Sequence, residues 1–138
     1  MRDEPLLRLH GLADNMTELC ICEDYVASIT YRTCLIFRKR IAKFMRYPAI
    51  RRILVRDGPR YATLRLEDSH GQVINIIGAS PAEMQQAGML ISERIYRAHV
   101  NAEGSPADGM LVFPETLAAL HERGLLTDAY FAAKQQEA

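Results

Sequence analysis

The chain has 138 residues, of which 49% are hydrophobic and 25% are charged, and its 17 basic side chains equal its 17 acidic ones in number. These values are typical of one soluble globular domain that needs no disulfides to hold its core. No apolar run approaches the roughly 20 residues of a membrane-spanning helix. The first residues lack a sustained apolar segment, so they do not indicate a signal peptide.

Residues 1–16 are predicted to be a polar leader, in which "PLLRLHGLAD" forms a turn of helix packed on the domain. The following segments are rich in β-branched and aromatic residues or alternate apolar and charged residues, which predicts strands. Turn residues separate them. The predicted strands are "TELCIC", "YVASITY", "TCLIF", "IRRILVRDG", "RYATLRLED" and "VINIIG".

A strong helix is predicted after these strands. Ser80 and Glu83 form a capping box, and Pro81 occupies the first helical position. The helix should end near residues 99–101. Gly88 costs about 1 kcal/mol of helix propensity relative to Ala, which indicates close packing of the helix on the sheet.

Residues 102–112 form a predicted linker, and residues 113–138 form a predicted helical hairpin. Pro114 starts its first helix, Gly124 ends that helix, and Thr127 caps the second. So short a segment buries little surface alone, so it must pack on the main domain, on a copy of itself or on a partner. We expect these residues to serve assembly: Leu117, Leu120, Leu125, Leu126, Tyr130 and Phe131.

Together these elements predict an α+β fold. Residues 17–101 form its main domain, because hairpin-length turns without βαβ alternation favour an antiparallel meander or partly open barrel. One helix caps this sheet, and the helical hairpin follows it.

The order of several antiparallel strands, a last strand ending in glycine and one capped helix resembles the bacterial pleckstrin-homology-like domains. The stretch most similar to that family is "YPAIRRILVRDG … ATLRLEDSHGQVINIIGASPAEMQQAGMLISERI". The resemblance covers about residues 17–100. It implies a binding or assembly role and supplies no catalytic residue.

The end of the chain, "ETLAALHERGLLTDAYFAAKQQ", resembles the short C-terminal module called SHOCT. That module joins a helix of Leu-x-x-Leu pattern to a Gly-Leu-Leu-Thr turn and a helix with an aromatic residue before Ala-Lys. Such tails often accompany bacterial pleckstrin-homology-like domains. The matching positions here are Leu117, Leu120, Gly124, Leu125, Leu126, Thr127, Asp128, Phe131, Ala133 and Lys134.

The neutral net charge hides a strong asymmetry. Residues 32–65 contain eleven basic residues and one acid, so the remaining segments are strongly acidic. Clustered Lys and Arg attract phosphates and acidic headgroups. The candidate residues for an anionic partner are Arg38, Lys39, Arg40, Lys43, Arg46, Arg51 and Arg52.

Three interpretations of this basic stretch stay open. Acids at Glu18, Glu23 and Asp24 and on the C-terminal helices could pair with it inside the chain or across subunits, which the overall charge balance favours. Nucleic acid is possible because Phe37, Phe44 and Tyr47 interleave with the charges and could stack on bases. An anionic lipid headgroup is possible too.

Neither the motifs nor the cysteines predict an enzyme. There is no Gly-rich phosphate loop, H-E-x-x-H or G-x-S-x-G motif, and His70 falls in a predicted solvated turn. Cys20, Cys22 and Cys34 could bind zinc with a histidine, but burial as small hydrophobes is the preferred interpretation. We therefore predict no metal and no cofactor. The odd number of cysteines indicates reduced thiols and a cytoplasmic location.

The sequence thus predicts a non-enzymatic binding module that associates with itself or with a partner protein through its basic region and tail. A small nucleic-acid-binding regulator is the alternative.

Overall fold

The computed structural model describes residues 6–11, 16–34, 36–102 and 114–137. Within them the chain is α+β, with two antiparallel sheets and three α-helices, which confirms the predicted class. The sheets do not join into a closed barrel among these residues. The four-stranded sheet has the order β1-β2-β3-β4 and comprises β1 (Leu7–Gly11), β2 (Met16–Ile21), β3 (Tyr25–Cys34) and β4 (Phe37–Arg46).

The second sheet has three strands in sequence order and follows a short 3-10 turn, η1 (Tyr47–Ala49). Its inward residues alternate with outward ones, as expected for a half-buried sheet. On the middle strand Leu64 and Leu66 are buried, whereas Arg65 between them is exposed. The strands are β5 (Ile50–Asp57), β6 (Ala62–Asp68) and β7 (Val73–Ala79).

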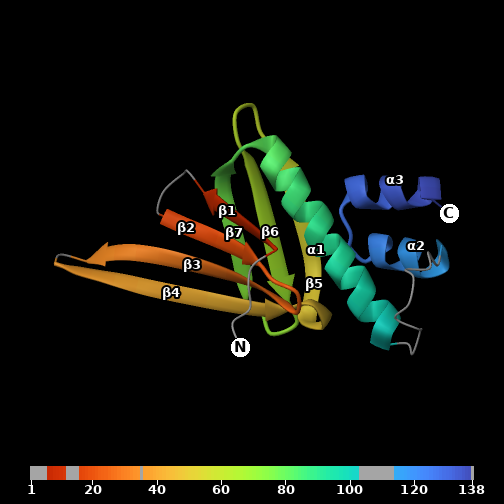
Figure 1. Ribbon diagram of the computed structural model, residues 1–138, viewed down its shortest axis with the longest axis horizontal. Helices are drawn as coiled ribbons and strands as arrows, with labels where there is room; N and C mark the ends of the chain where they lie inside the picture. The colour runs from red at the N-terminus through yellow and green to blue at the C-terminus, as the bar shows by residue number, and fades with distance from the viewer. Residues whose placement is uncertain (1–5, 12–15, 35, 103–113, 138) are drawn as a thin grey trace.

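Helix α1 (Pro81–Ala102) lies across the three-stranded sheet (Figure 1). Its Met84, Ala87, Ile91 and Ile95 are buried in one cluster with leucines and isoleucines of the two sheets. The Ser80 hydroxyl accepts the Glu83 amide at 3.2 Å, as predicted for a capping box. The Glu83 carboxylate, in turn, accepts from the Ser80 hydroxyl at 3.0 Å rather than from its backbone.

Helices α2 (Pro114–Glu122) and α3 (Asp128–Glu137) lie beside α1 on the side next to β5 (Figure 1). Gly124 has φ of +80°, the left-handed conformation that glycine allows after a helix. The Thr127 hydroxyl accepts the Tyr130 amide at 3.2 Å and so caps α3. Both signals were predicted from the sequence.

Two predictions near the N-terminal half are wrong. The helical turn expected within residues 5–14 is replaced by strand β1, because Leu7 and Leu9 alternate with Arg8 and the strand pairs with β2. The strand expected at residues 33–37 instead spans the end of β3, Ile36 in the turn and the start of β4. Residues 1–5, 12–15 and 103–113, which include most of the predicted leader and linker, lie outside the described residues.

Candidate functional site: an arginine surface on β5, β6 and the tail turn

The basic stretch divides between two strands in different surroundings. Strand β4 carries Arg38, Lys39, Arg40, Lys43 and Arg46 along the edge of the four-stranded sheet. At about 3.3 Å per residue, Arg38 and Arg46 are about 26 Å apart, and the far end of the β3–β4 hairpin projects from the rest of the fold (Figure 1). The side chains of Arg38 and Lys39 lie outside what the structure describes. These residues therefore do not converge on one point.

Strand β5 brings its basic residues together with those of other elements. An open hollow of about 600 Å³ has walls formed by strands β5 and β6 and by the turn after α2. A second hollow of about 380 Å³ continues over the outer face of the same sheet and shares Arg52, Arg65 and Glu67 with the first. We call the joint lining the arginine surface and define it by its five guanidinium groups: Arg51, Arg52, Arg56, Arg65 and Arg123.

Strand geometry explains why these side chains share a face. Ile53 of β5 is buried and Val55 contacts the position of Gly88 on α1, so Arg52, Leu54 and Arg56 point outward. Leu54 is paired with Arg65 on β6. Arg52 is paired with Glu67 and Arg56 with Thr63, so Arg65 lies diagonally to Arg52 and Arg56, about 7–8 Å away across the strands.

Most of this charge has no ionic partner in the described part of the chain. Arg65 donates from Nε to Glu67 at 2.8 Å. No carboxylate of the described residues forms an ion pair with Arg51, Arg52, Arg56 or Arg123.

Of the acids expected to neutralise the basic stretch, Glu18 pairs with another base, whereas Glu23 and Asp24 line one hollow together with Arg46. Glu18 pairs with Arg8 at 3.8 Å, and on α1 Glu93 pairs with Arg97 at 3.4 Å and Lys134 at 3.6 Å. Among the described residues, neither Arg40 nor Lys43 nor Arg46 forms an ion pair with an acid. Pairing of the basic stretch with acids inside the chain or across subunits, the preferred interpretation from sequence, stays a prediction.

One acid of the larger hollow, Asp68, is hydrogen-bonded to backbone amides. The Asp68 carboxylate is buried and accepts the amides of His70 at 2.9 Å and Gln72 at 2.7 Å. This holds the β6–β7 turn, where Gly71 has φ of +85° at the predicted tight position. Asp68 thus shapes the hollow and adds a carboxylate to its lining.

The tail turn is attached directly to the strand that carries Arg51 and Arg52. The carbonyl of Gly124 accepts the Ile53 amide of β5 at 2.8 Å. A Cβ at Gly124 would lie 3.5 Å from Cγ of Arg52, so the Arg52 stem rests against the turn. Arg123, one residue before Gly124, is placed at the hollow by this contact.

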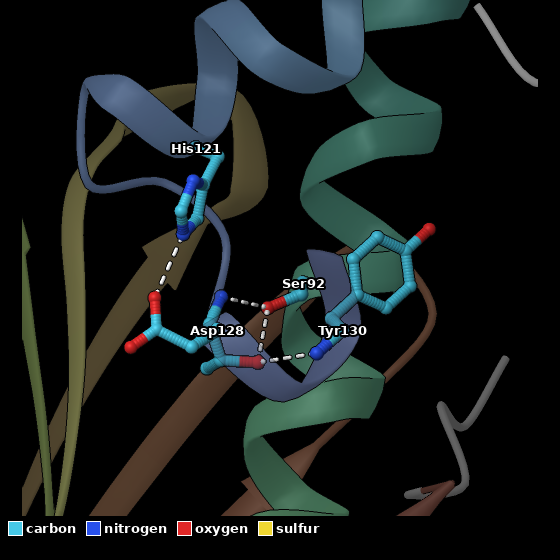
Figure 2. Close-up of polar contacts among 5 residues, drawn as sticks. Ser92, His121, Asp128 and Tyr130 are labelled. Atoms are coloured by element: carbon cyan, nitrogen blue, oxygen red, sulfur yellow. Dashed lines mark hydrogen bonds and ion pairs between the residues drawn. The ribbon is translucent and has the colours of Figure 1, made fainter. Parts of the chain in front are cut away.

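A set of polar contacts holds the tail on α1 (Figure 2). The buried Ser92 hydroxyl accepts the Thr127 amide at 3.0 Å and lies 3.5 Å from the Thr127 hydroxyl. The Tyr130 hydroxyl donates to Glu93 at 3.0 Å. Between the two tail helices, His121 Nε2 lies 2.7 Å from Asp128 Oδ1. A buried hydroxyl that contacts both the amide and the hydroxyl of Thr127 fixes the position of that residue, where α3 begins.

The residues predicted to serve assembly lie mostly inside the chain. Leu117, Leu120, Leu125, Leu126 and Tyr130 are buried and belong to the same cluster as the core of the main domain. Phe131 is half-buried and stacks on His121, with ring centroids 4.0 Å apart. Of the three alternatives left open for the tail, the structure has it packed on the main domain.

The cysteines of β2 and its end lie in the interior. Cys20 and Cys22 are both buried. Burial, together with the Glu18 carboxylate that accepts from the thiol at 3.1 Å, raises the pKa of Cys20 from 9.0 to about 12. Such a thiol stays protonated at neutral pH and is a poor nucleophile. Within the described residues, no group of three or more His, Cys, Asp or Glu side chains is placed to hold a metal ion.

Sequence reasoning found Arg51 and Arg52 but missed Arg56, Arg65 and above all Arg123 as parts of the same surface. Arg123 is about 70 residues away from β5 in sequence. The only sequence signal for Arg123 was its position directly before Gly124. Gly124 ends a helix, and the end of a helix that docks on β5 lies next to that strand.

Comparison of the chain with protein-family models, with curated proteins and with solved structures finds no match. Across the described residues, none of the helices is both long and apolar enough to cross a membrane. The fold and the site therefore define an α+β protein with an open, arginine-lined surface shared by a sheet and a docked helical tail.

Proposed function

We propose that this protein is a non-enzymatic binding module with a pleckstrin-homology-like core, and that it docks an anionic partner on the arginine surface. The observation that carries the proposal is the gathering of Arg51, Arg52, Arg56 and Arg123, none of which forms an ion pair with the described acids. Five arginines share this open surface with three acids, Glu67, Asp68 and Glu122, and the excess of guanidinium groups attracts oxyanions.

The order of the elements supports the core that the sequence resembles. Four antiparallel strands, three further strands and a helix across the second sheet follow one another in the chain. The two helices after α1 occupy the region that resembles SHOCT.

Retention on heparin–agarose tests the proposal, because heparin presents dense sulfate and carboxylate groups. Arg51→Gln/Arg52→Gln should elute at clearly lower salt than the parent protein, since each guanidinium contact contributes to the salt dependence. Arg60→Gln is the control, because Arg60 is an exposed arginine of the same charged segment that lines neither hollow. Equal elution of the double variant, the control and the parent protein would disprove the site.

A nucleic-acid-binding role is the second candidate, and the placement of β4 favours it. Arg40, Lys43 and Phe44 are exposed along a strand at the edge of the sheet, where a long polyanion has room to lie. Arg40→Gln/Lys43→Gln should then weaken binding to single-stranded DNA more than Arg51→Gln/Arg52→Gln does. The two double variants remove the same charge, so they separate the two surfaces.

Self-association is the third part of the proposal. Because Leu120 and Leu125 are buried in their own chain, these two side chains can contact a second copy only if the tail leaves α1. Size-exclusion chromatography with light scattering measures the mass of the parent protein and of Ser92→Ala, which weakens the tail contacts. A monomer in both would rule out assembly through the tail.

A further inference from the structure

The larger hollow is built from two parts of the molecule that are far apart in sequence. One wall carries Arg51 and Arg52 of β5 and Arg65 of β6, and the other carries Arg123 and Gly124 of the tail turn. The hydrogen bond from the Ile53 amide to the Gly124 carbonyl holds these walls together. A ligand that spans the two walls of the hollow would therefore contact the main domain and the tail at once.

The charges of the hollow suit a small anion better than a long one. Four arginines line the hollow, and a guanidinium group offers a planar fork that matches the oxygens of a tetrahedral or planar anion. Three acids, Glu67, Asp68 and Glu122, line it too, so the four positive charges exceed the negative ones by one, and the acids would repel a polyanion that continued past the arginines. A volume of about 600 Å³ lies in the range of small-molecule sites.

We infer that this hollow binds a compact oxyanion group of phosphate size, held jointly by β5, β6 and the tail turn, and that occupancy and tail docking stabilise each other. This inference rests on the proposed function and adds the chemical class of the ligand and the coupling between ligand binding and tail docking. Two events that share one set of contacts are linked reciprocally: if the anion favours the docked tail by some factor, the docked tail favours the anion by the same factor.

Inorganic phosphate, added at constant ionic strength, is the first probe. Amide NMR spectra should show saturable shifts at Arg51, Arg52 and Gly124. Arg52→Gln and Arg123→Gln should each weaken phosphate binding about tenfold, the loss expected for one charge-assisted hydrogen-bonding group. Arg60→Gln removes an exposed arginine outside the hollow and should leave the affinity unchanged.

Hydrogen exchange of the Ile53 amide measures tail docking, because that amide is bonded to Gly124. Phosphate should slow its exchange in the parent protein. Thr127→Val removes the hydroxyl that caps α3 and meets Ser92, so it should speed exchange at Ile53 and weaken phosphate binding. Arg123→Gln leaves these contacts intact, so it should lose phosphate binding with little change in exchange without ligand.

The outcomes separate the possible sources of the oxyanion and the two proposals. If both free phosphate and vesicles containing phosphatidic acid bind, the protein recognises the phosphate group on a lipid surface. If only free phosphate binds, the ligand is a small molecule. Phosphate binding that Arg123→Gln does not weaken would overturn the shared site. If heparin retention depends on Arg51 and Arg52 but phosphate does not bind, the proposed function stands and this inference fails. If neither anion binds, both fail.

Discussion

Strands β4 and β5 are consecutive in the chain and similarly basic, yet they end in different environments. Along the β4 edge, Lys43 and Phe44 are exposed. Strand β5 is flanked by β6 on one side and bonded to the tail turn on the other, with α1 packed on its inner face. The same local charge therefore gives a spread-out edge in one case and a concentrated surface in the other. Convergence from several elements, rather than the count of basic residues, distinguishes the two.

The largest expected effect on the free energy of unfolding compares the tail, which belongs to the folded core, with the turn between β3 and β4, which does not. Leu125 is 1% exposed and Ile36 is 88% exposed. Leu125→Ala should lower the free energy of unfolding by about 3 kcal/mol, from lost burial and the cavity that remains. Ile36→Ala should change it by less than about 0.5 kcal/mol. Urea unfolding measures both, and equal effects would contradict the difference between the two regions.

Alkaline stability tests the base of the four-stranded sheet, where Tyr47 follows β4. The buried Tyr47 hydroxyl donates to the carbonyls of Cys22 at 2.5 Å and Tyr25 at 3.1 Å. Burial raises the pKa of Tyr47 above its usual range, and burial with Glu18 raises the pKa of Cys20 to about 12. Both groups keep their protons in the folded state at a pH where the unfolded chain has lost them.

Stability should therefore be constant at neutral pH and should fall as the pH rises above about 9 for Cys20 and about 10 for Tyr47. Each group contributes at most about 1.4 kcal/mol per pH unit in that range. Urea unfolding between pH 7 and 11 measures the slope. Tyr47→Phe should cost about 1–2 kcal/mol at pH 7, because two buried carbonyls lose their donor, and should flatten the slope above pH 10. An unchanged slope in this variant would refute the assignment to Tyr47.

Gly88 tests how closely β5, α1 and the tail approach one another. A Cβ there would lie 2.9 Å from Cγ2 of Val55 and 3.1 Å from Cγ2 of Thr127. Gly88→Ala gains about 1 kcal/mol of helix propensity but overpacks the contact, which costs about 1–3 kcal/mol. We expect a net loss of about 1 kcal/mol in urea unfolding.

The matched control is the same substitution in a Val55→Ala background. Removing the Val55 methyl groups relieves the closer of the two contacts, so Gly88→Ala should then cost little or nothing. A gain of about 1 kcal/mol from Gly88→Ala alone would mean that the helix and strand are further apart than described.

Local signals in the sequence predicted the elements that depend on neighbouring residues. The capping box at Ser80, the left-handed Gly124, the Thr127 cap and the turn at Gly71 all follow from backbone chemistry within a few residues. Gly88 was also predicted to allow close packing, and the contacts to Val55 and Thr127 agree. Strand β6 was predicted from its period-2 alternation, β7 from its short apolar run, and β5 from apolar residues that end at a turn signal.

Predictions failed where a partner distant in sequence decides the outcome. Residues of β1 became a strand through pairing with β2, and the basic residues of β4 concealed a strand that pairs along its full length with β3. The arginine surface was only half predicted for the same reason. Arg123 lines the same hollow as Arg52 because the tail docks on α1 and β5. No local sequence pattern encodes this tertiary contact.

The smallest expected effect concerns the contact between β4 and the β6–β7 region. Lys43 Nζ donates to the Val73 carbonyl at 3.0 Å, and Gln72 Nε2 donates to the Phe44 carbonyl at 2.7 Å, both at exposed positions. Exposed hydrogen bonds exchange with water at little net cost, so Lys43→Ala should lower the free energy of unfolding by no more than about 0.5 kcal/mol in urea. A loss above about 1.5 kcal/mol would mean that Lys43 holds the two sheets together. A loss within the expected limit would mean that the fold does not depend on the charge of Lys43. The contribution of Lys43 to polyanion binding can then be measured without a change in stability.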